Sequence, residues 1–316
     1  MPTPDVFPPS HQHPTGARGP ALLAALEQDA ERLPNELNLN GCGLSEWPGS
    51  LRRCTHARTL SVYDNALTTV PDWLWSWTGL RTLNLSANRL TYLSPGVGNL
   101  TGLEMLDLGH NGLEALPDAF AGMAELRFLY LSNNRLTALP ESLRHLRSLA
   151  YLNVTDNALE QLPGWLGELG RQVEFRAYNN ALTALPASLG QLSELRELHV
   201  MNNRLTRLPP ELGRCTRLGK LMAQGNRLTA LPDEIGRLTA LGELDLRFNG
   251  LTELPASLAE LESLRVLDLR ANRLTTLPPE LAALPRLEKL DLRWNRLSTL
   301  PPAFAELEAR GCLIYA

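Results

Sequence analysis

Hydrophobic and polar positions along most of the chain repeat with a period of 23 residues. An asparagine marks each period from Asn65 to Asn295 without a slip, and Cys42 takes the same place one period earlier. A leucine follows each of these twelve positions by two residues, and a proline follows eleven of them by six. Self-similarity at a fixed period of this size predicts a stack of twelve repeats rather than two separate globular domains.

Within one repeat the apolar pattern changes from a period of two to a helical spacing. In the segment LRVLDLRANRLTTLPPELAAL, residues 264–284, the alternation around Asp268 predicts a short strand with Leu267 and Leu269 facing inward. The later leucines are three or four residues apart and follow Pro278, which predicts a 3-10 or short helical return. One unit cannot bury its own apolar edge, so neighbouring units must share a core.

The recurring asparagine is predicted to be structural. It follows the strand, where the chain bends inward, and its amide can donate to and accept from backbone groups that would otherwise be buried unpaired. The four cysteines, Cys42, Cys54, Cys215 and Cys312, show no CxxC or CxH spacing, so the sequence gives no support for a zinc or thioredoxin-like site. We expect free thiols in a reducing compartment.

The flanking segments differ from the repeats in composition. Residues 1–20 are proline-rich and are expected to form a disordered tail, and the apolar spacing in residues 21–33 predicts an N-terminal capping helix. The twelve repeats occupy residues 34–302, and residues 303–316 are expected to form a C-terminal cap with a final strand in residues 311–316. The chain has no run of about 18 apolar residues, so a membrane-spanning helix is not expected.

The repeated unit L-x-x-L-x-L-x-x-N-x-L-x-x-L-P resembles the leucine-rich repeat family, in its 23-residue intracellular class. It is similar to plant Ras-group proteins and to bacterial cytosolic or injected repeat proteins. The resemblance implies an α/β right-handed horseshoe solenoid, with a parallel sheet on the concave face and 3-10 or short helices on the convex face. It also implies a protein partner in the concavity. The paired-cysteine caps of extracellular members are missing from the sequence, which favours a cytoplasmic location.

Charge and residue types argue against several other functions. The formal net charge of -4 provides no bulk attraction to nucleic acid or to an anionic membrane. Acidic residues such as Glu174 and Glu197 are interleaved with the basic ones and oppose phosphate, so nucleic-acid binding is unfavoured. His199 has no Ser or Cys in the columns around it, and we therefore expect no catalytic residues. The cysteine spacing gives no reason to expect a metal, and no cofactor is expected. No enzyme domain is expected outside the repeats.

The outward-facing strand positions carry the variation between repeats. They lie six, four, two and one residues before each repeated asparagine, and in the first three repeats they read as small and polar. In repeats five to nine they are larger, and these residues form a predicted partner-binding patch: Phe128, Tyr130, Tyr151, Arg176, Tyr178, His199, Met201, Met222 and Gln224. Aromatic residues, methionine and arginine are enriched in interface cores. The alternative is that cross-strand pairs only stabilise the sheet, by about 0.2 to 1 kcal/mol each.

The last three full repeats share a charged motif in the segments LDLRFN, LDLRAN and LDLRWN. One column holds Asp245, Asp268 and Asp291, and the next holds Arg247, Arg270 and Arg293. We favour the interpretation that these aspartates and arginines form a lattice of ion pairs with one another. In the alternative, the arginines bind an acidic partner between the flanking aromatic residues Phe248 and Trp294.

Together these patterns predict a non-enzymatic module that binds a protein partner on its concave face. Abundant Ala, Arg, Gly and Pro favour a GC-rich, bacterial coding genome, and the proline-rich start is compatible with a bacterial effector that is secreted into a host cell cytosol. An alternative is a regulatory or substrate-recognition subunit of a signalling or ubiquitin-ligase-type complex. The sequence does not indicate the identity of the partner.

Overall fold

The computed structural model describes residues 19–29 and 34–316, which divide into two compact units. Unit 1 comprises the described residues up to 136 together with 140–153, and unit 2 comprises 137–139 and 154–316. Nearly all of the predicted tail, residues 1–20, lies outside the described residues. So do residues 30–33 of the predicted capping helix.

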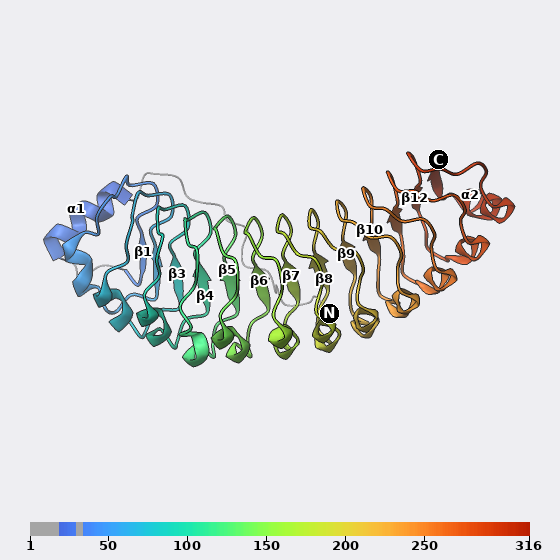
Figure 1. The fold of residues 1–316 in the computed structure, drawn as a ribbon. Helices are drawn as coiled ribbons and strands as arrows, with labels where there is room; N and C mark the ends of the chain where they lie inside the picture. The colour runs from blue at the N-terminus through green and yellow to red at the C-terminus, as the bar shows by residue number, and fades with distance from the viewer. Residues whose placement is uncertain (1–18, 30–33) are drawn as a thin grey trace, which may run out of the picture. The chain divides into compact units, whose positions relative to one another are not determined.

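Unit 1 contains six short strands that pair in parallel and in chain order (Figure 1). Each residue lies opposite the residue 23 positions along, so that Asp107 lies between Asn84 and Tyr130. The strands are β1 (Glu36–Asn38), β2 (Thr59–Ser61), β3 (Thr82–Asn84), β4 (Met105–Asp107), β5 (Phe128–Tyr130) and β6 (Tyr151–Asn153).

Unit 2 continues the same pattern with seven parallel strands, again paired in chain order. Its strands are β7 (Glu174–Arg176), β8 (Glu197–His199), β9 (Lys220–Met222), β10 (Glu243–Asp245), β11 (Val266–Asp268), β12 (Lys289–Asp291) and β13 (Leu313–Tyr315). The strand expected in residues 311–316 is β13, which pairs with β12.

Short 3-10 helices return the chain after each strand, as the leucine and proline spacing predicts. Most of them begin directly after the proline of the repeat, and each buries an apolar residue. They are Gly49–Arg53, Asp72–Ser76, Pro95–Asn99, Phe120–Gly122, Glu141–His145, Gly164–Glu168, Ala187–Gln191, Pro210–Arg214, Asp233–Arg237, Ala256–Glu260, Pro279–Ala283 and Pro302–Phe304. Within each unit they form a row on the side away from the strands (Figure 1).

The core lies between the strands and the 3-10 helices of each unit. Leu267 and Leu269 are fully buried, as the alternation predicts, and the equivalent residues of β1 to β12 and of the turns after them are buried as well. Phe175 and Ala177 replace this pair of leucines in β7 and the residues after it, and they are also fully buried. The predicted leucine-rich repeat arrangement of parallel strands and 3-10 returns is confirmed.

The repeated asparagines form the predicted hydrogen-bond ladder. Asn272 donates from Nδ2 to the carbonyl oxygens of Leu246 and Leu269, both at 3.0 Å, and its Oδ1 accepts the N–H of Leu251 at 3.0 Å. Asn88 makes the equivalent three bonds in unit 1 at 3.0 to 3.1 Å. The ladder therefore satisfies backbone groups that have no partner within their own strand.

The residue before each ladder asparagine adopts the left-handed backbone conformation. Its φ lies between 52° and 69° in all eleven repeats. Asp, Asn, His or Gly occupies the position in seven repeats and alanine in two, and most of these tolerate the conformation well. Phe248 and Trp294 occupy it in the other two, at φ 55° and 62°.

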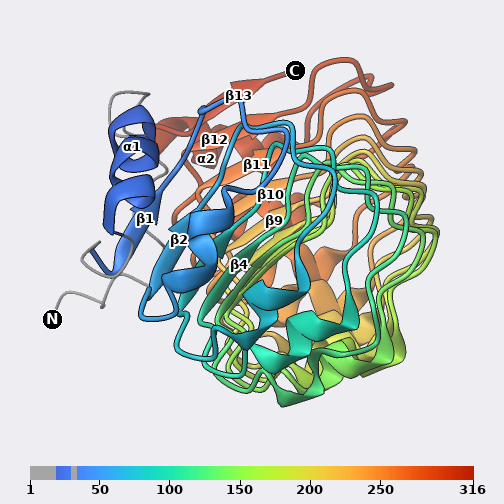
Figure 2. The ribbon, with the colours of Figure 1, turned by 90° about the vertical axis from the view of Figure 1, so that its left-hand side faces the viewer.

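Helices are found near both ends of the described chain. Helix α1 (Gly19–Asp29) lies beside β1 in unit 1 (Figure 2), and α2 (Ala305–Ala309) follows the last 3-10 helix in unit 2. Leu26 of α1 and Leu307 of α2 are fully buried. Both helices therefore place an apolar side chain against the repeat next to them.

Candidate functional site

The outward side chains of the strands and of the turn that follows them form what we call the strand face. These are the residues six, four, two and one positions before each ladder asparagine. In repeat four they are Met105, Asp107, Gly109 and His110. Because the strands pair in register, each of these positions forms a column across the sheet of its unit.

Three predicted patch residues lie in unit 1. The rings of Tyr130 and Tyr151 are 4.9 Å apart between centroids, at an interplanar angle of 38°. The guanidinium carbon of Arg127 lies 5.5 Å from the ring centroid of Phe128. Cross-strand packing of the kind that stabilises sheets is therefore present here, in agreement with the structural alternative.

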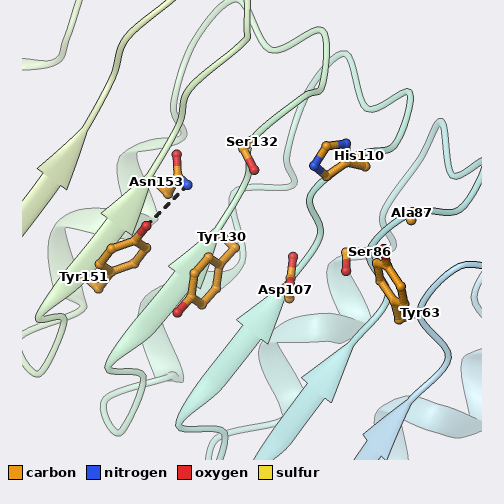
Figure 3. Close-up of a pocket in the computed structure, with 9 residues that line it drawn as sticks. All are labelled: Tyr63, Ser86, Ala87, Asp107, His110, Tyr130, Ser132, Tyr151 and Asn153. Atoms are coloured by element: carbon orange, nitrogen blue, oxygen red, sulfur yellow. Dashed lines mark hydrogen bonds between the residues drawn. The ribbon is translucent and has the colours of Figure 1, made fainter. Parts of the chain in front are cut away.

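A hollow opens on the strand face of unit 1, and Tyr130 forms one of its walls (Figure 3). Tyr63, Asp107 and Tyr130 come from three different repeats and are arranged in a row across the sheet, with Asp107 between the two rings. The complete lining is Tyr63, Ser86, Ala87, Asp107, His110, Tyr130, Ser132, Tyr151 and Asn153.

Asp107 has a defined position in this hollow. Asp107 is 7% exposed, and its Oδ1 accepts a hydrogen bond from the backbone N–H of Gly109 at 2.9 Å. The residues of the same two columns on the neighbouring strands are neutral, namely Asn84, Ser86, Tyr130 and Ser132. Asp107 therefore supplies negative charge to a hollow whose walls are aromatic and hydroxyl-bearing.

The patch residues of unit 2 are interleaved with acidic residues. His199 Nε2 lies 2.9 Å from Glu197 Oε2, and Arg176 pairs with the buried carboxylate of Glu174. The hydrogen bond from His199 lowers the pKa of Glu197, and the charges of His199, Lys220 and Arg176 act in the same direction. Tyr178, Met201, Met222 and Gln224 are half-buried on the same face.

Two patch residues are less exposed than expected. Tyr130 is 7% exposed and His199 8%, although both point outward from their strands. Side chains in one column of a parallel sheet are only about 4.8 Å apart, so large neighbours cover each other. The expectation that outward-facing means exposed is therefore wrong at these two positions.

The aspartates and arginines of the last three full repeats form the predicted ion-pair lattice. Arg Nη2 lies 3.0, 2.6 and 2.7 Å from Asp Oδ2 in the pairs Asp245–Arg247, Asp268–Arg270 and Asp291–Arg293. Arg270 Nε also lies 3.4 Å from Oδ2 of Asp291 on the next strand. The aspartates are buried and each pairs with the arginine two residues later, as the lattice interpretation predicts, although the buried Nε of Arg247 has no hydrogen-bond partner.

Phe248 and Trp294 are exposed beside this lattice. Phe248 is 55% exposed and Trp294 66%, and the Trp294 ring centroid lies 5.9 Å from the guanidinium carbon of Arg293. Both residues combine an exposed apolar ring with a left-handed backbone, which is unfavourable for a bulky side chain. Trp294 gains a cation–π contact with Arg293 from this placement.

One further group of titratable residues could hold a metal ion among the described residues. Single ligand atoms of Glu174, Glu197 and His199 lie within 4.8 Å of one another. These side chains already pair with Arg176 and with each other, as described above. The spacing of these residues in the sequence did not point to the group.

The cysteines behave as structural thiols. All four are free, and Cys54, Cys215 and Cys312 are buried. Burial raises the pKa of Cys215 to about 11 and raises the pKa of the other three. A raised thiol pKa disfavours the reactive thiolate. Across residues 19–29 and 34–316, no helix combines the length and apolar character needed to cross a membrane.

Of the nine residues that line the unit 1 hollow, sequence reasoning predicted only Tyr130 and Tyr151 and missed the other seven, among them Tyr63, Asp107 and His110. Tyr63 also corrects the expectation that the strand face of the first three repeats is small and polar. A signal was available in the segment LDLGHN, where Gly109 stands in the position that is arginine in LDLRFN, LDLRAN and LDLRWN. Only the tertiary structure, however, shows that Tyr130 of the next strand and Tyr63 from two repeats earlier line the same hollow.

Two family models match the chain. A leucine rich repeat model matches residues 78–136, 216–274, 239–297 and 262–309, and a leucine-rich repeat region model matches residues 120–227. Together the matches extend from residue 78 to residue 309. No curated protein sequence matches the chain.

Solved structures with the same fold come from bacteria and plants. A leucine-rich repeat protein of Leptospira interrogans is 23% identical, with a TM-score of 0.57 over 93% of this chain and 98% of that one. An internalin of Listeria monocytogenes is 20% identical, with a TM-score of 0.72 over 94% of both chains.

A third structure is the ectodomain of the Arabidopsis thaliana membrane receptor kinase GASSHO1/SCHENGEN3, solved in complex with Casparian strip integrity factor 2. It is 31% identical, with a TM-score of 0.66 over 85% of this chain. The match spans only 36% of the length of that ectodomain.

Proposed function

Because the chain belongs to the leucine-rich repeat family, whose fold is a common scaffold for protein–protein interaction, we propose that it is a non-enzymatic module that binds a protein partner through its strand face. The plant receptor kinase ectodomain, which shares this fold and binds Casparian strip integrity factor 2, supports the proposal by analogy.

The observation that carries the proposal is the pair Phe248 and Trp294. An exposed aromatic ring costs solubility, and a left-handed backbone costs of order 1 to 3 kcal/mol for such residues. Asparagine or aspartate fills the same position at lower cost in five other repeats. Aromatic residues next to arginines are the residue types that dominate binding energy at protein interfaces.

We place this interaction in a reducing cytoplasm. The four free thiols with raised pKa suit that compartment. The source is proposed to be bacterial, and the compartment is either its own cytoplasm or, for a secreted effector, the cytosol of a host cell. Capture experiments with source lysate and with host lysate separate these two locations.

The test combines binding with stability. The full chain and the double variant Phe248→Asn/Trp294→Asn are immobilised, and proteins captured from each lysate are quantified by mass spectrometry. We expect a partner that the wild-type chain retains and the double variant loses. Asparagine tolerates the left-handed conformation, so Phe248→Asn should raise the free energy of unfolding by up to about 1 kcal/mol.

The matched control is Tyr92→Asn, because Tyr92 is also 66% exposed but lies outside the strand face. It should leave capture unchanged. Equal capture by the double variant and the wild type would remove Phe248 and Trp294 from the interface. A loss of stability in Phe248→Asn would show instead that the ring supports the scaffold.

A further inference from the structure

Glu174 is a buried carboxylate at a position where the other strands carry more accessible side chains. It is 2% exposed, whereas the first residues of the other strands from β1 to β13 are half-buried or exposed. Gln172, in the core of the same repeat, is fully buried and donates from Nε2 to the backbone carbonyl oxygen of Glu174 at 2.5 Å. The next repeat has Leu195 in place of Gln172. Repeat seven therefore holds the backbone of Glu174 with a polar side chain where the next repeat packs leucine.

The two carboxylate oxygens of Glu174 differ in their surroundings. Oε1 pairs with Nε of Arg176, whereas Oε2 is buried and has no hydrogen-bond partner. In the lattice of the same unit, by contrast, both oxygens of Asp268 accept hydrogen bonds from Arg270. A buried charged oxygen costs free energy unless something pairs with it, so Oε2 of Glu174 is a candidate ligand for an ion.

The neighbouring strand brings two more ligand groups to this carboxylate. Glu197 on β8 lies directly opposite Glu174 on β7, and the two strands are adjacent in Figure 1. His199 Nε2 lies 2.9 Å from Glu197 Oε2. One ligand atom from each of Glu174, Glu197 and His199 lies within 4.8 Å of the other two. Ionised carboxylates offer only acceptor atoms, so two of them side by side favour a cation between them.

An imidazole nitrogen with two carboxylate oxygens suits a divalent transition metal. Zn²⁺ takes such ligands at roughly 2.0 to 2.2 Å and commonly uses three protein ligands with a fourth position open, whereas Mg²⁺ and Ca²⁺ prefer more numerous oxygen ligands. Ligand atoms around a tetrahedral Zn²⁺ ion are roughly 3.4 Å apart, so side-chain rotations are needed to close the group. The side chain of Glu197 is 30% exposed, which leaves it room to move and leaves the ion a way in.

We propose that Glu174, Glu197 and His199 bind a divalent transition-metal ion of the zinc type between repeats seven and eight. The ion takes the place of the hydrogen bond between His199 and Glu197, and Oε2 of Glu174 is its third ligand. The bond of Arg176 to Oε1 then orients the Glu174 carboxylate, as hydrogen bonds to metal ligands commonly do. The proposal rests on these contacts and not on the protein-binding function proposed above.

The first measurement uses the metal alone. The full chain, without an affinity tag and freed of metal by a chelator and dialysis, is titrated with ZnCl₂, MgCl₂ or CaCl₂ in a calorimeter. We expect one Zn²⁺ ion per chain to bind at least about tenfold more tightly than Mg²⁺ or Ca²⁺. Because an ion held by the folded repeats stabilises them, saturating Zn²⁺ should also raise the Tm.

A second measurement locates the ion. The histidine rings are labelled with isotopes and their NMR signals are followed during the ZnCl₂ titration. The signals of His199 should shift in proportion to the bound fraction found by calorimetry, and those of His110 in unit 1 should remain unchanged.

Three variants test the assignment of the ligands. Glu174→Gln, Glu197→Gln and His199→Gln should each weaken Zn²⁺ binding at least about tenfold. Glutamine at position 199 can still hydrogen-bond to Glu197, so this variant removes the ligand nitrogen with little change to the scaffold. The matched control is Glu243→Gln, which makes the same change in the same column but outside the group and should leave the affinity within about twofold. Far-ultraviolet circular dichroism checks that all variants are folded.

A further control concerns two histidines near the start of the chain. His11 and His13 lie two residues apart in the sequence and are themselves possible metal ligands. The double variant His11→Gln/His13→Gln should bind Zn²⁺ with unchanged affinity. Loss of binding in this variant would place the ion in the N-terminal segment and overturn the proposal.

Other outcomes would also overturn it. Equal affinity for Mg²⁺ and Zn²⁺, or an equal effect of Glu243→Gln, would indicate general attraction to acidic residues. Unchanged Zn²⁺ affinity in His199→Gln would remove the imidazole from the site. Absence of Zn²⁺ binding by the wild-type chain in the millimolar range would show that Arg176 alone neutralises this group.

Discussion

In unit 2, Asp268 lies beneath the guanidinium group of Arg270, whereas in unit 1 Asp107, at the same position of its repeat, is followed by Gly109 and lines a hollow. Both carboxylates are nearly buried and both accept the backbone N–H two residues later. The two regions therefore differ in the residue two positions after the aspartate and in the neighbouring strands, which place Asn84 and Tyr130 beside Asp107 but Asp245 and Asp291 beside Asp268.

The difference also affects what each region contributes to stability. In unit 2 each arginine meets an aspartate of its own strand, and Arg247 and Arg270 also lie near an aspartate of the next strand, at 3.9 and 3.4 Å. Such a network ties neighbouring repeats together, although a buried ion pair contributes little net free energy relative to apolar packing. In unit 1 the neighbouring neutral residues make hydrogen bonds of their own, such as Ser86 Oγ to Asn84 Oδ1 at 2.6 Å.

The largest expected effect comes from making unit 2 resemble unit 1. Arg270→Ala removes the main partner of buried Asp268 and one contact of Asp291, and it should lower the free energy of unfolding by about 1 to 3 kcal/mol. Urea denaturation measures the change. The exposed residue Arg273 provides the control, since Arg273→Ala should change the midpoint very little.

A double variant sharpens this result. Removing both members of the pair, as Asp268→Asn/Arg270→Ala, leaves no unpaired charge and should recover part of the loss. If the double variant is as unstable as Arg270→Ala alone, the arginine acts through packing of its methylene groups and not through the carboxylate.

A smaller effect is expected in how the free energy of unfolding depends on pH through the aspartates of the lattice. Burial alone would raise the pKa of Asp291, but hydrogen bonds from Arg293 and the charges of Arg270 and Arg293 outweigh it and lower the pKa. A carboxyl with a lowered pKa in the folded state stabilises the protein above its unfolded pKa of about 3.9, and this stability is lost as the pH falls through the folded pKa. Asp291→Asn should therefore reduce the loss of stability between pH 5 and pH 3.

The pKa of Asp245 is shifted in the opposite direction to that of Asp291, so this residue provides the comparison. Burial raises its pKa, and the backbone hydrogen bond and charge of Arg247 do not fully offset this. The folded state then binds a proton more readily than the unfolded state, so acidification through this range stabilises the protein. Asp245→Asn should make the urea midpoint more sensitive to acid, and equal slopes for the Asp245 and Asp291 variants would contradict both assignments.

The smallest expected effect comes from making unit 1 resemble unit 2. Gly109→Arg replaces a flexible residue and adds an ion pair with Asp107, which should raise the free energy of unfolding by about 0.5 kcal/mol. A Cβ atom at this position would lie 3.1 Å from Ser132 Oγ and 3.2 Å from Asp107 Oδ1, so a small shift is required. Destabilisation by more than about 1 kcal/mol would show that repeat four cannot adopt the lattice arrangement, and the comparison would fail.

Most of the fold could be predicted because the information is local and repeated. The alternation around Leu267 and Leu269, the prolines that precede the 3-10 helices and the ladder asparagines each act within one repeat or between adjacent repeats. Their spacing therefore predicted strands, returns and ladder with correct positions. The Asp/Arg lattice was predicted for the same reason, since the two members of each pair lie two residues apart in one repeat, the aspartate at the end of the strand and the arginine in the turn after it.

The amino-acid sequence by itself thus determined the repeat, which of its residues face the core, and the ion pairs that form within one repeat. The tertiary structure alone decided which outward side chains are covered and which are accessible. Tyr130 and His199 are buried by neighbours on adjacent strands, and the hollow around Asp107 combines Tyr63 and Tyr130 from repeats three periods apart. Whether an outward side chain is covered depends on the sizes of its neighbours on several adjacent strands. The spacing of residues along the chain does not provide this information.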